Sequence, residues 1–97
     1  MQDEKTSEQR AIRLKRLAMR SRRRGIREMD LVLGAYAHAR LETMTSKELN
    51  DYESLLCEND QDLHAWVTGA AEVPLNLSVQ VSKIVDFLAE PGLKPFN

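Results

Sequence analysis

Apolar residues recur along most of this chain at intervals of three and four, which is the spacing of one face of an α-helix. No segment alternates apolar and polar residues over several positions, so the pattern gives no sign of a β-sheet. The apolar residues fall into five sets with this spacing, which predict an all-α protein, a compact bundle of about five short helices. In chain order they are Ala11, Leu14, Leu17 and Ala18; Met29, Leu33, Tyr36, Ala37 and Arg40, widened by Val32 and Leu41; Leu49, Tyr52, Leu55 and Leu56; Leu63, Trp66, Val67 and Ala70; and Leu77, Val81, Ile84, Val85 and Leu88.

Local signals mark the ends of the first two helices. Thr6 and Gln9 have the spacing of a capping box, so we expect the first helix to begin there. It should end at Gly25, because glycine takes the left-handed conformation of a C-terminal cap without a Cβ penalty. The second helix then runs from about Ile26 to Thr43, so the two helices meet at a single glycine.

The other three helices also carry capping and breaking residues. In "TSKE", Thr45 and Glu48 form a second capping box at the start of the third helix. Asn59 or Asp60 caps the fourth helix, and Pro74 separates it from the fifth. All of the predicted helices are short, with brief connections between them.

The length of 97 residues predicts one domain, because a core of this size cannot be divided and remain stable. We expect residues 1–97 to form a single helical domain with frayed tails at 1–6 and 91–97, where Pro91 and Gly92 stop the last helix. Apolar residues at 42% and charged residues at 30% are typical of a folded globular protein. The longest apolar run is a few residues, so we expect no membrane insertion.

The net charge of −1 conceals a strong asymmetry. Residues 10–27 carry nine basic and no acidic side chains, whereas residues 28–97 carry four basic and twelve acidic ones. Such polarity implies either an acidic partner for the basic segment or an internal match between the two parts of the chain.

Side chains able to perform chemistry are scattered. His38, Cys57 and His64 lie on different predicted helices without metal-ligand spacing, so we expect a buried Cys57 and surface or boundary histidines. The single cysteine also excludes an internal disulfide. No nucleophile elbow, phosphate-binding loop or calcium loop is present. We therefore expect no catalytic residue, no metal site and no enzymatic activity.

The junction of the first two helices, "RRGIRE", combines a glycine with opposite charges. Arg24 precedes the break, and Glu28 lies in the first turn of the next helix, where the helix dipole favours a carboxylate. An Arg24 guanidinium can grip two oxygens in a fork. The junction is therefore either a helix corner held by an Arg–Glu pair or a binding surface.

Two segments of the chain resemble the succinate dehydrogenase assembly factors, the small flavinylation proteins of bacteria and mitochondria. "RRGIREMD" carries the R-G-x-x-E hallmark of that family, and "LLCENDQDLHAWVTG" carries a D-x-D-L-x-x-W pattern. The two blocks occur in the family's order and cover roughly residues 15–70. The matching residues are Arg24, Gly25 and Glu28 in the first block and Asp60, Asp62, Leu63, Trp66 and Gly69 in the second.

The resemblance implies an assembly chaperone. Such factors bind the free flavoprotein subunit of succinate dehydrogenase, and often that of fumarate reductase, and promote covalent attachment of FAD to a histidine of that subunit. FAD is then the cofactor of the partner, and the resemblance gives no cofactor to this chain. We expect a monomer when the partner is absent.

The charges and the glycine of the junction, together with the family resemblance, predict which residues bind the partner. Gly25 would let partner backbone come close, Arg24 would donate forked hydrogen bonds to the partner, and Glu28 would orient Arg24 or accept from a partner cation. Arg23 and Arg27 would steer the protein toward an acidic patch. We expect Leu63 and Trp66 to support this surface from the core.

Two other classes of function fit the same sequence. The basic helix at 10–27 suits a small regulatory or nucleic-acid-associated protein, although the acidic remainder argues against specific nucleic-acid binding. An antitoxin-like binding module would also use a protein surface. Three acids within the first eight residues are unlike a mitochondrial presequence, so we expect a bacterial cytoplasmic location rather than the mitochondrial matrix.

Overall fold

Helices account for nearly all of the regular structure in the computed structural model, which describes the backbone of residues 3–90 and the side chains from residue 7 to residue 90. Within that range there are five α-helices and no strand, so the all-α prediction is confirmed. The elements are α1 (Asp3–Arg22), α2 (Arg27–Arg40), the short 3-10 helix η1 (Leu41–Thr43), α3 (Ser46–Leu56), α4 (Asp60–Thr68), the 3-10 helix η2 (Leu75–Leu77) and α5 (Ser78–Leu88).

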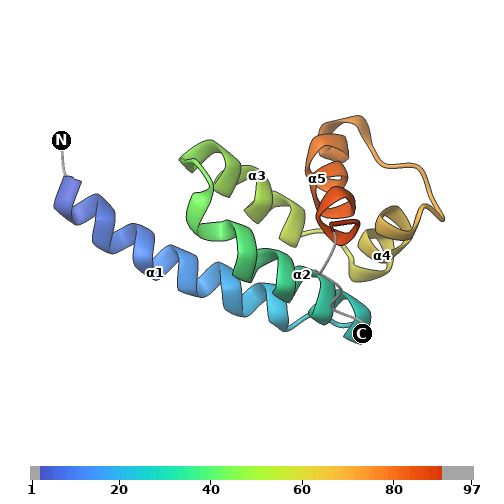
Figure 1. Ribbon diagram of the computed structural model, residues 1–97, viewed down its shortest axis with the longest axis horizontal. Coiled ribbons are helices and arrows are strands. Elements are labelled where there is room, and N and C mark those ends of the chain that lie inside the picture. The colour runs from blue at the N-terminus through green and yellow to red at the C-terminus, as the bar shows by residue number, and fades with distance from the viewer. Residues whose placement is uncertain (1–2, 91–97) are drawn as a thin grey trace.

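The helices pack around α2. The long helix α1 lies along α2 and runs in the opposite direction, with its N-terminal part reaching beyond the other helices (Figure 1). On the other side α2 contacts α4 and α5, and α3 bridges α1 and α5. None of the helices in residues 3–90 combines the length and apolar character that a membrane crossing requires.

The core is built mainly from the predicted apolar faces, but Ala11 and Ala70 are exposed, so their predicted place on those faces is wrong. Leu63 is buried as expected, and Trp66 is partly buried against the core. Leu17, Leu33, Tyr52 and Ile84 come from four different helices, and each is at most 1% exposed. Tyr36 packs between two rings, with centroid distances of 5.7 Å to Tyr52 and 5.5 Å to Phe87. Burial of each such side chain contributes about 1.5–3 kcal/mol.

The face of α5 differs from the prediction. Val85 is exposed, whereas Phe87 is buried against Tyr36. The buried face follows residues 77, 80, 81, 84 and 87, so it is turned from the expected stripe by about one residue. The larger Phe87 side chain occupies the core-facing position that the simple count of apolar residues gave to Val85.

Most predicted caps are present. Thr45 and Glu48 form the capping box of α3, with both reciprocal hydrogen bonds in place. Asn59 caps α4 by accepting from the Gln61 backbone N–H at 2.8 Å. Gly69 ends α4 in the left-handed conformation, with φ of 83°.

The ends of the first two helices differ from the prediction. Helix α1 already begins at Asp3, so Thr6 lies inside the helix, and the segment expected as a tail is helical from residue 3. Helix α1 ends at Arg22, and Gly25 does not adopt a left-handed conformation, which among the described residues occurs only at Gly69. The expected tail at 91–97, with its Pro91-Gly92 stop, lies outside the described residues.

Candidate functional site at the α1–α2 corner

The connection between α1 and α2, residues 23–26, is held by a carboxylate from α4. The Arg24 Nε donates to Asp60 Oδ1 at 2.7 Å, and an Arg24 terminal nitrogen donates to the Glu58 carbonyl at 3.3 Å. The Arg24 side chain is only 9% exposed and that of Asp60 18%. This ion pair is therefore largely shielded from solvent. Attraction between charges is stronger in such a shielded position than at the exposed surface.

The second oxygen of the same carboxylate binds the next residue of the corner. The Gly25 backbone N–H donates to Asp60 Oδ2 at 2.5 Å. A Cβ placed on Gly25 would lie 3.1 Å from that oxygen, closer than ordinary van der Waals contact. Gly25 thus gives Asp60 room for a close approach, and it does not adopt a left-handed turn.

A second carboxylate holds the corner from α2. The Arg24 backbone N–H donates to the Asp30 carboxylate, which lies in the first turn of α2. The residue at the N-terminal cap of α2, Ile26, supplies no side-chain hydrogen bond. Asp30 and Glu28 therefore supply the negative charge that the N-terminus of a helix favours.

The predicted site residues divide into two groups. Arg24 is turned inward onto α4, whereas Arg23, Gly25, Arg27 and Glu28 are exposed. Of the two alternatives for the junction, a corner held by an Arg24–Glu28 pair is not found, because the Arg24 guanidinium binds Asp60 instead. Within the described residues Glu28 makes no hydrogen bond or ion pair. We call these four exposed residues the corner surface.

Sequence reasoning missed the roles of Asp60 and Asp30. Asp60 was interpreted as a helix cap, and it does lie at the start of α4, but its side chain binds Arg24 and Gly25. Its place in the D-x-D-L-x-x-W pattern was a signal that more than a cap was required there. Asp30 ends the quoted "RRGIREMD" segment, but nothing in its spacing indicated a bond back to Arg24.

A buried hydroxyl pair fixes the end of α1 just before the corner. The Ser21 side chain is fully buried, donates to the Leu17 carbonyl at 2.8 Å and lies 2.6 Å from the Tyr52 hydroxyl. Burial raises the pKa of Tyr52 well above its ordinary value, so this phenol stays protonated. The pair joins α1 to α3 directly behind the corner.

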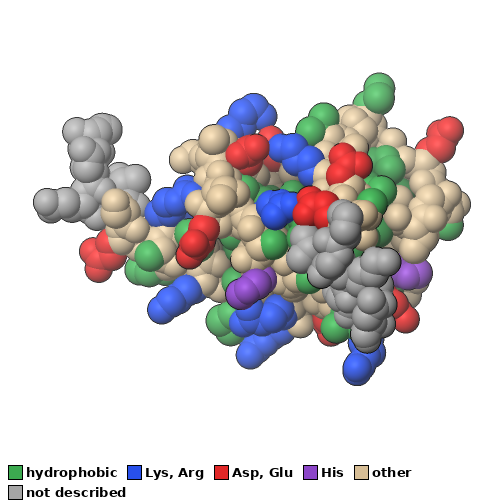
Figure 2. All heavy atoms as spheres, viewed as in Figure 1, with side chains coloured by type: hydrophobic (Ala, Val, Ile, Leu, Met, Phe, Trp, Pro, Cys, Tyr) green, Lys and Arg blue, Asp and Glu red, His purple; other side chains and the backbone are tan. Residues whose placement is uncertain are grey.

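Part of the basic charge of α1 is matched inside the molecule. Arg13, Arg16 and Arg20 all reach the Glu53 carboxylate, at 2.8, 3.8 and 3.5 Å. Arg10 donates to the Met44 carbonyl at 2.7 Å. Basic side chains still project along the edge that α1 forms (Figure 2). Internal pairing thus accounts for only part of the charge asymmetry, because three arginines share the single Glu53 carboxylate.

No second chemical centre accompanies the corner in the described residues. They contain no cluster of three or more His, Cys, Asp or Glu side chains able to hold a metal ion. The prediction of a buried Cys57 is wrong: the thiol is free and exposed, and its sulfur accepts from Arg20 at 3.7 Å. Cys57 follows the last residue of α3, one step of about 100° beyond buried Leu56, which turns it to solvent.

Comparison with known proteins places the corner in a family. The family model described as "Flavinator of succinate dehydrogenase" matches residues 15–90, which include the whole corner and its carboxylates. The chain belongs to this family. The resemblance drawn from the two sequence blocks is therefore confirmed.

Curated relatives agree with the family match. A succinate dehydrogenase assembly factor 2, mitochondrial, of Lodderomyces elongisporus is 40% identical over 86 residues, covering 88% of this chain and 52% of the relative. The protein of the same name from Dictyostelium discoideum is 38% identical over 71 residues, covering 73% of this chain and 50% of the relative. This member of the flavinator family thus spans about half the length of these relatives.

The relatives also correct the predicted location. They carry names that place them in mitochondria, so the expectation of a bacterial cytoplasmic protein is wrong. That expectation depended on three acidic residues within the first eight positions of the sequence. Three residues are too little evidence to decide where a protein is located.

Proposed function

We propose that this protein binds the free flavoprotein subunit of succinate dehydrogenase and promotes covalent attachment of FAD to it. The support is membership of a family described as the flavinator of succinate dehydrogenase, together with the exposed corner surface, which includes Gly25 and Glu28 of the R-G-x-x-E sequence. The protein would act as an assembly chaperone without an active site of its own. From the names of the relatives, we also propose that it works in mitochondria.

In this proposal the bond-forming chemistry belongs to the partner. FAD is the partner's cofactor, and the flavin and the flavoprotein supply the electrophile and the attacking histidine. The helper contributes by holding the flavoprotein in a geometry where those groups meet, which lowers the entropic part of the barrier.

The corner surface is suited to that task because carboxylates of Asp60 and Asp30 hold the backbone of the connection in place. Asp60 binds both Arg24 and Gly25, so the backbone at the glycine is preorganised before any partner arrives. Gly25 offers no side chain at the point of approach, and Arg23, Arg27 and Glu28 flank it with charges of both signs. We therefore assign partner contact to the four residues of the corner surface. We assign a positioning role to Arg24, whose side chain is hydrogen-bonded to Asp60 and to the Glu58 carbonyl.

The test is to produce the flavoprotein with and without this protein and to measure covalent flavin fluorescence after denaturing electrophoresis. We expect a several-fold increase in covalent flavin when the protein is present. Gel filtration should show a one-to-one complex with the flavoprotein, whereas the 11.1 kDa chain alone should elute as a monomer. The flavoprotein of fumarate reductase serves as a second substrate. Equal flavin incorporation with and without the protein would overturn the proposal.

A further inference from the structure

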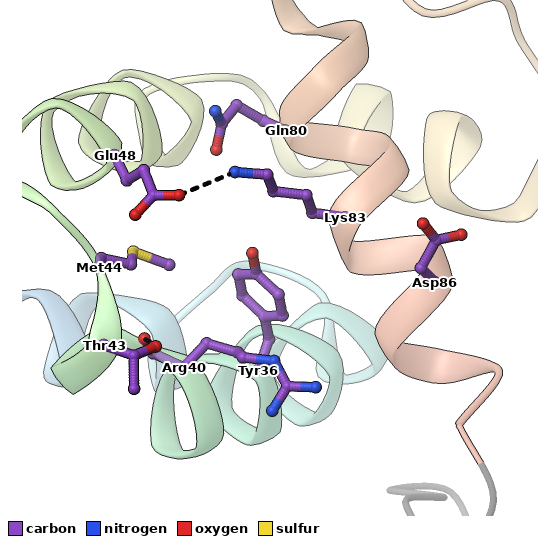
Figure 3. Close-up of a pocket in the computed structure, with 8 residues that line it drawn as sticks. All are labelled: Tyr36, Arg40, Thr43, Met44, Glu48, Gln80, Lys83 and Asp86. Atoms are coloured by element: carbon purple, nitrogen blue, oxygen red, sulfur yellow. Dashed lines mark hydrogen bonds and ion pairs between the residues drawn. The ribbon is translucent and has the colours of Figure 1, made fainter.

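Helix α1 presents an exposed face that is rich in arginine. An open pocket of about 500 Å³ lies on it, lined by four arginines and one methionine: Arg16, Met19, Arg20, Arg23 and Arg24. The pocket drawn in Figure 3, between α2, η1, α3 and α5, differs in charge, because its lining holds two cations and two carboxylates, and Lys83 is paired with Glu48. On α1 the lining contains cations and no carboxylate. Arg24 is already neutralised by Asp60, and we call the other four lining residues the arginine face.

The three arginines of the arginine face are only partly neutralised. Arg16 and Arg20 share the single Glu53 carboxylate, at 3.8 and 3.5 Å, and the shortest contact with it, 2.8 Å, belongs to Arg13. Among residues 7–90 the side chain of Arg23 forms no hydrogen bond or ion pair. Arginine has five N–H donors, accepts no hydrogen bond and stays protonated in proteins. A ligand for this face must therefore be an anion that accepts hydrogen bonds.

Apolar side chains alternate with arginines along the same side of α1. Four side chains spaced by four, three and four residues follow one another there: Ile12, Arg16, Met19 and Arg23. Ile12 is 59% exposed and Met19 is 43% exposed. A ligand seated here would contact apolar groups as well as guanidinium groups. A protein segment that carries acidic and apolar side chains provides both kinds of contact.

We propose that the arginine face binds an acidic segment of a protein partner and, resting on the proposed function, that this segment belongs to the flavoprotein subunit. Arg23 belongs both to the arginine face and to the corner surface, so a protein bound at the corner can continue along α1. The rise from Arg16 to Arg20 is about 6 Å. Side chains two positions apart in an extended segment are separated by about 6.6 Å. Acidic residues at alternate positions of an extended segment therefore match the two guanidinium groups.

Two other anionic partners fit the arginine face less well. A membrane surface takes up the apolar side of an amphipathic helix, but that side of α1, with Leu17 fully buried, is packed into the core. A nucleic acid extends well beyond one helix face, and residues 28–97 carry twelve acidic side chains against four basic ones, which repel it. A short acidic segment meets neither obstacle.

The first test is an NMR titration of the full chain with a blocked pentapeptide of alternating glutamate and leucine. We expect saturable shifts of the Arg16, Arg20 and Arg23 side-chain N–H signals, with a dissociation constant on the order of millimolar because the ion pairs are exposed. The matching peptide of lysine and leucine should leave these signals unchanged. Arg16→Gln should weaken binding of the acidic peptide about fourfold. Lys15→Gln removes the same charge from an exposed position of α1 outside the pocket, so it should change binding less than about 1.5-fold. The inference is overturned if the acidic peptide does not shift the arginine face, or if both variants bind it as well as the parent protein.

The second test measures binding of the flavoprotein by the parent protein, Arg16→Gln and Lys15→Gln at physiological salt. Arg16 lies outside the corner surface, so a weaker complex of Arg16→Gln alone would assign the contact to α1. If the parent binds and Arg16→Gln binds equally well, the arginine face is not part of the interface, and the proposed function stands without this inference. If the parent does not bind the flavoprotein, the proposed function fails, and the peptide titration still decides whether the face takes an acidic segment. A DNA duplex or vesicles of phosphatidylglycerol that bind through Arg16 more tightly than the flavoprotein would replace the acidic segment as the ligand and overturn the inference.

Discussion

Arg24 and Asp60, 36 positions apart in the sequence, are joined by a 2.7 Å ion pair that links the α1–α2 corner to the first residue of α4. The other oxygen of the same carboxylate binds the Gly25 backbone. One side chain therefore holds two consecutive residues, Arg24 and Gly25, of the R-G-x-x-E sequence. We call the contacts of the Asp60 carboxylate with Arg24 and Gly25 the clasp, and the shape of the corner surface depends on it.

Asp60→Ala should lower the free energy of unfolding by about 2–3 kcal/mol, because it leaves a mostly buried guanidinium and a backbone N–H without their acceptor. Urea denaturation measures the change. Asp51→Ala is the control: its partner Lys47 is 83% exposed, and loss of such a surface pair should cost less than about 0.5 kcal/mol. Equal losses in the two variants would show that the clasp contributes no more than a surface ion pair.

Glu28→Gln should separate binding from folding. Glu28 is exposed and has no partner among the described residues, so its loss should change the unfolding free energy by less than about 0.5 kcal/mol. Covalent flavin on the partner should nevertheless fall at least tenfold, because we assign Glu28 to partner contact. Glu72→Gln, at another exposed acid after α4, should leave flavin incorporation unchanged. If both variants retained full activity, the assignment of Glu28 to partner contact would be wrong.

Two glycines should respond differently to alanine. Gly69 has φ of 83°, so Gly69→Ala should destabilise the fold by about 1 kcal/mol while leaving flavoprotein binding intact. At Gly25 a methyl group would lie 3.1 Å from Asp60 Oδ2, so Gly25→Ala should displace the clasp and weaken flavoprotein binding as well. Thermal unfolding and a binding titration measure the two effects. Equal binding by both variants would refute the assignment of Gly25.

Alkaline pH should destabilise the protein through Tyr52. Burial raises the pKa of Tyr52 above its ordinary value of 10.0, so the folded state keeps a proton that the unfolded state releases. The stabilisation is complete below pH 10 and declines as the pH rises above that value. Unfolding free energies measured from pH 8 to pH 11.5 should therefore fall above pH 10 more steeply in the parent protein than in Tyr52→Phe. Parallel curves would exclude Tyr52 as the source.

The features predicted correctly from the sequence were those set by near neighbours. The Thr45–Glu48 capping box and the Asn59 cap were predicted correctly because both partners lie within three residues. The apolar faces were recovered for the same reason, since periodicity is a local property. Val85 and Cys57 were placed wrongly because each lies at the edge of its face, where a rotation of one residue exchanges buried for exposed.

The partner of Arg24 could not be predicted in the same way. Glu28 was the nearest carboxylate in the sequence, but Asp60 reaches the guanidinium because α4 packs against α2. The prediction that Gly25 takes a left-handed cap conformation is wrong, and its close contact with Asp60 could not be predicted from the sequence.

The clasp also has a consequence for the order of events during synthesis. The ribosome completes Arg24 and Gly25 well before it adds Asp60, so the motif exists as sequence while its shape is still unformed. A nascent chain that stops short of α4 would carry every letter of R-G-x-x-E without the carboxylate that holds Arg24 and Gly25. If the proposed role of the corner is correct, a chain cut before α4 would contain the motif and still lack the fixed shape that recognition needs.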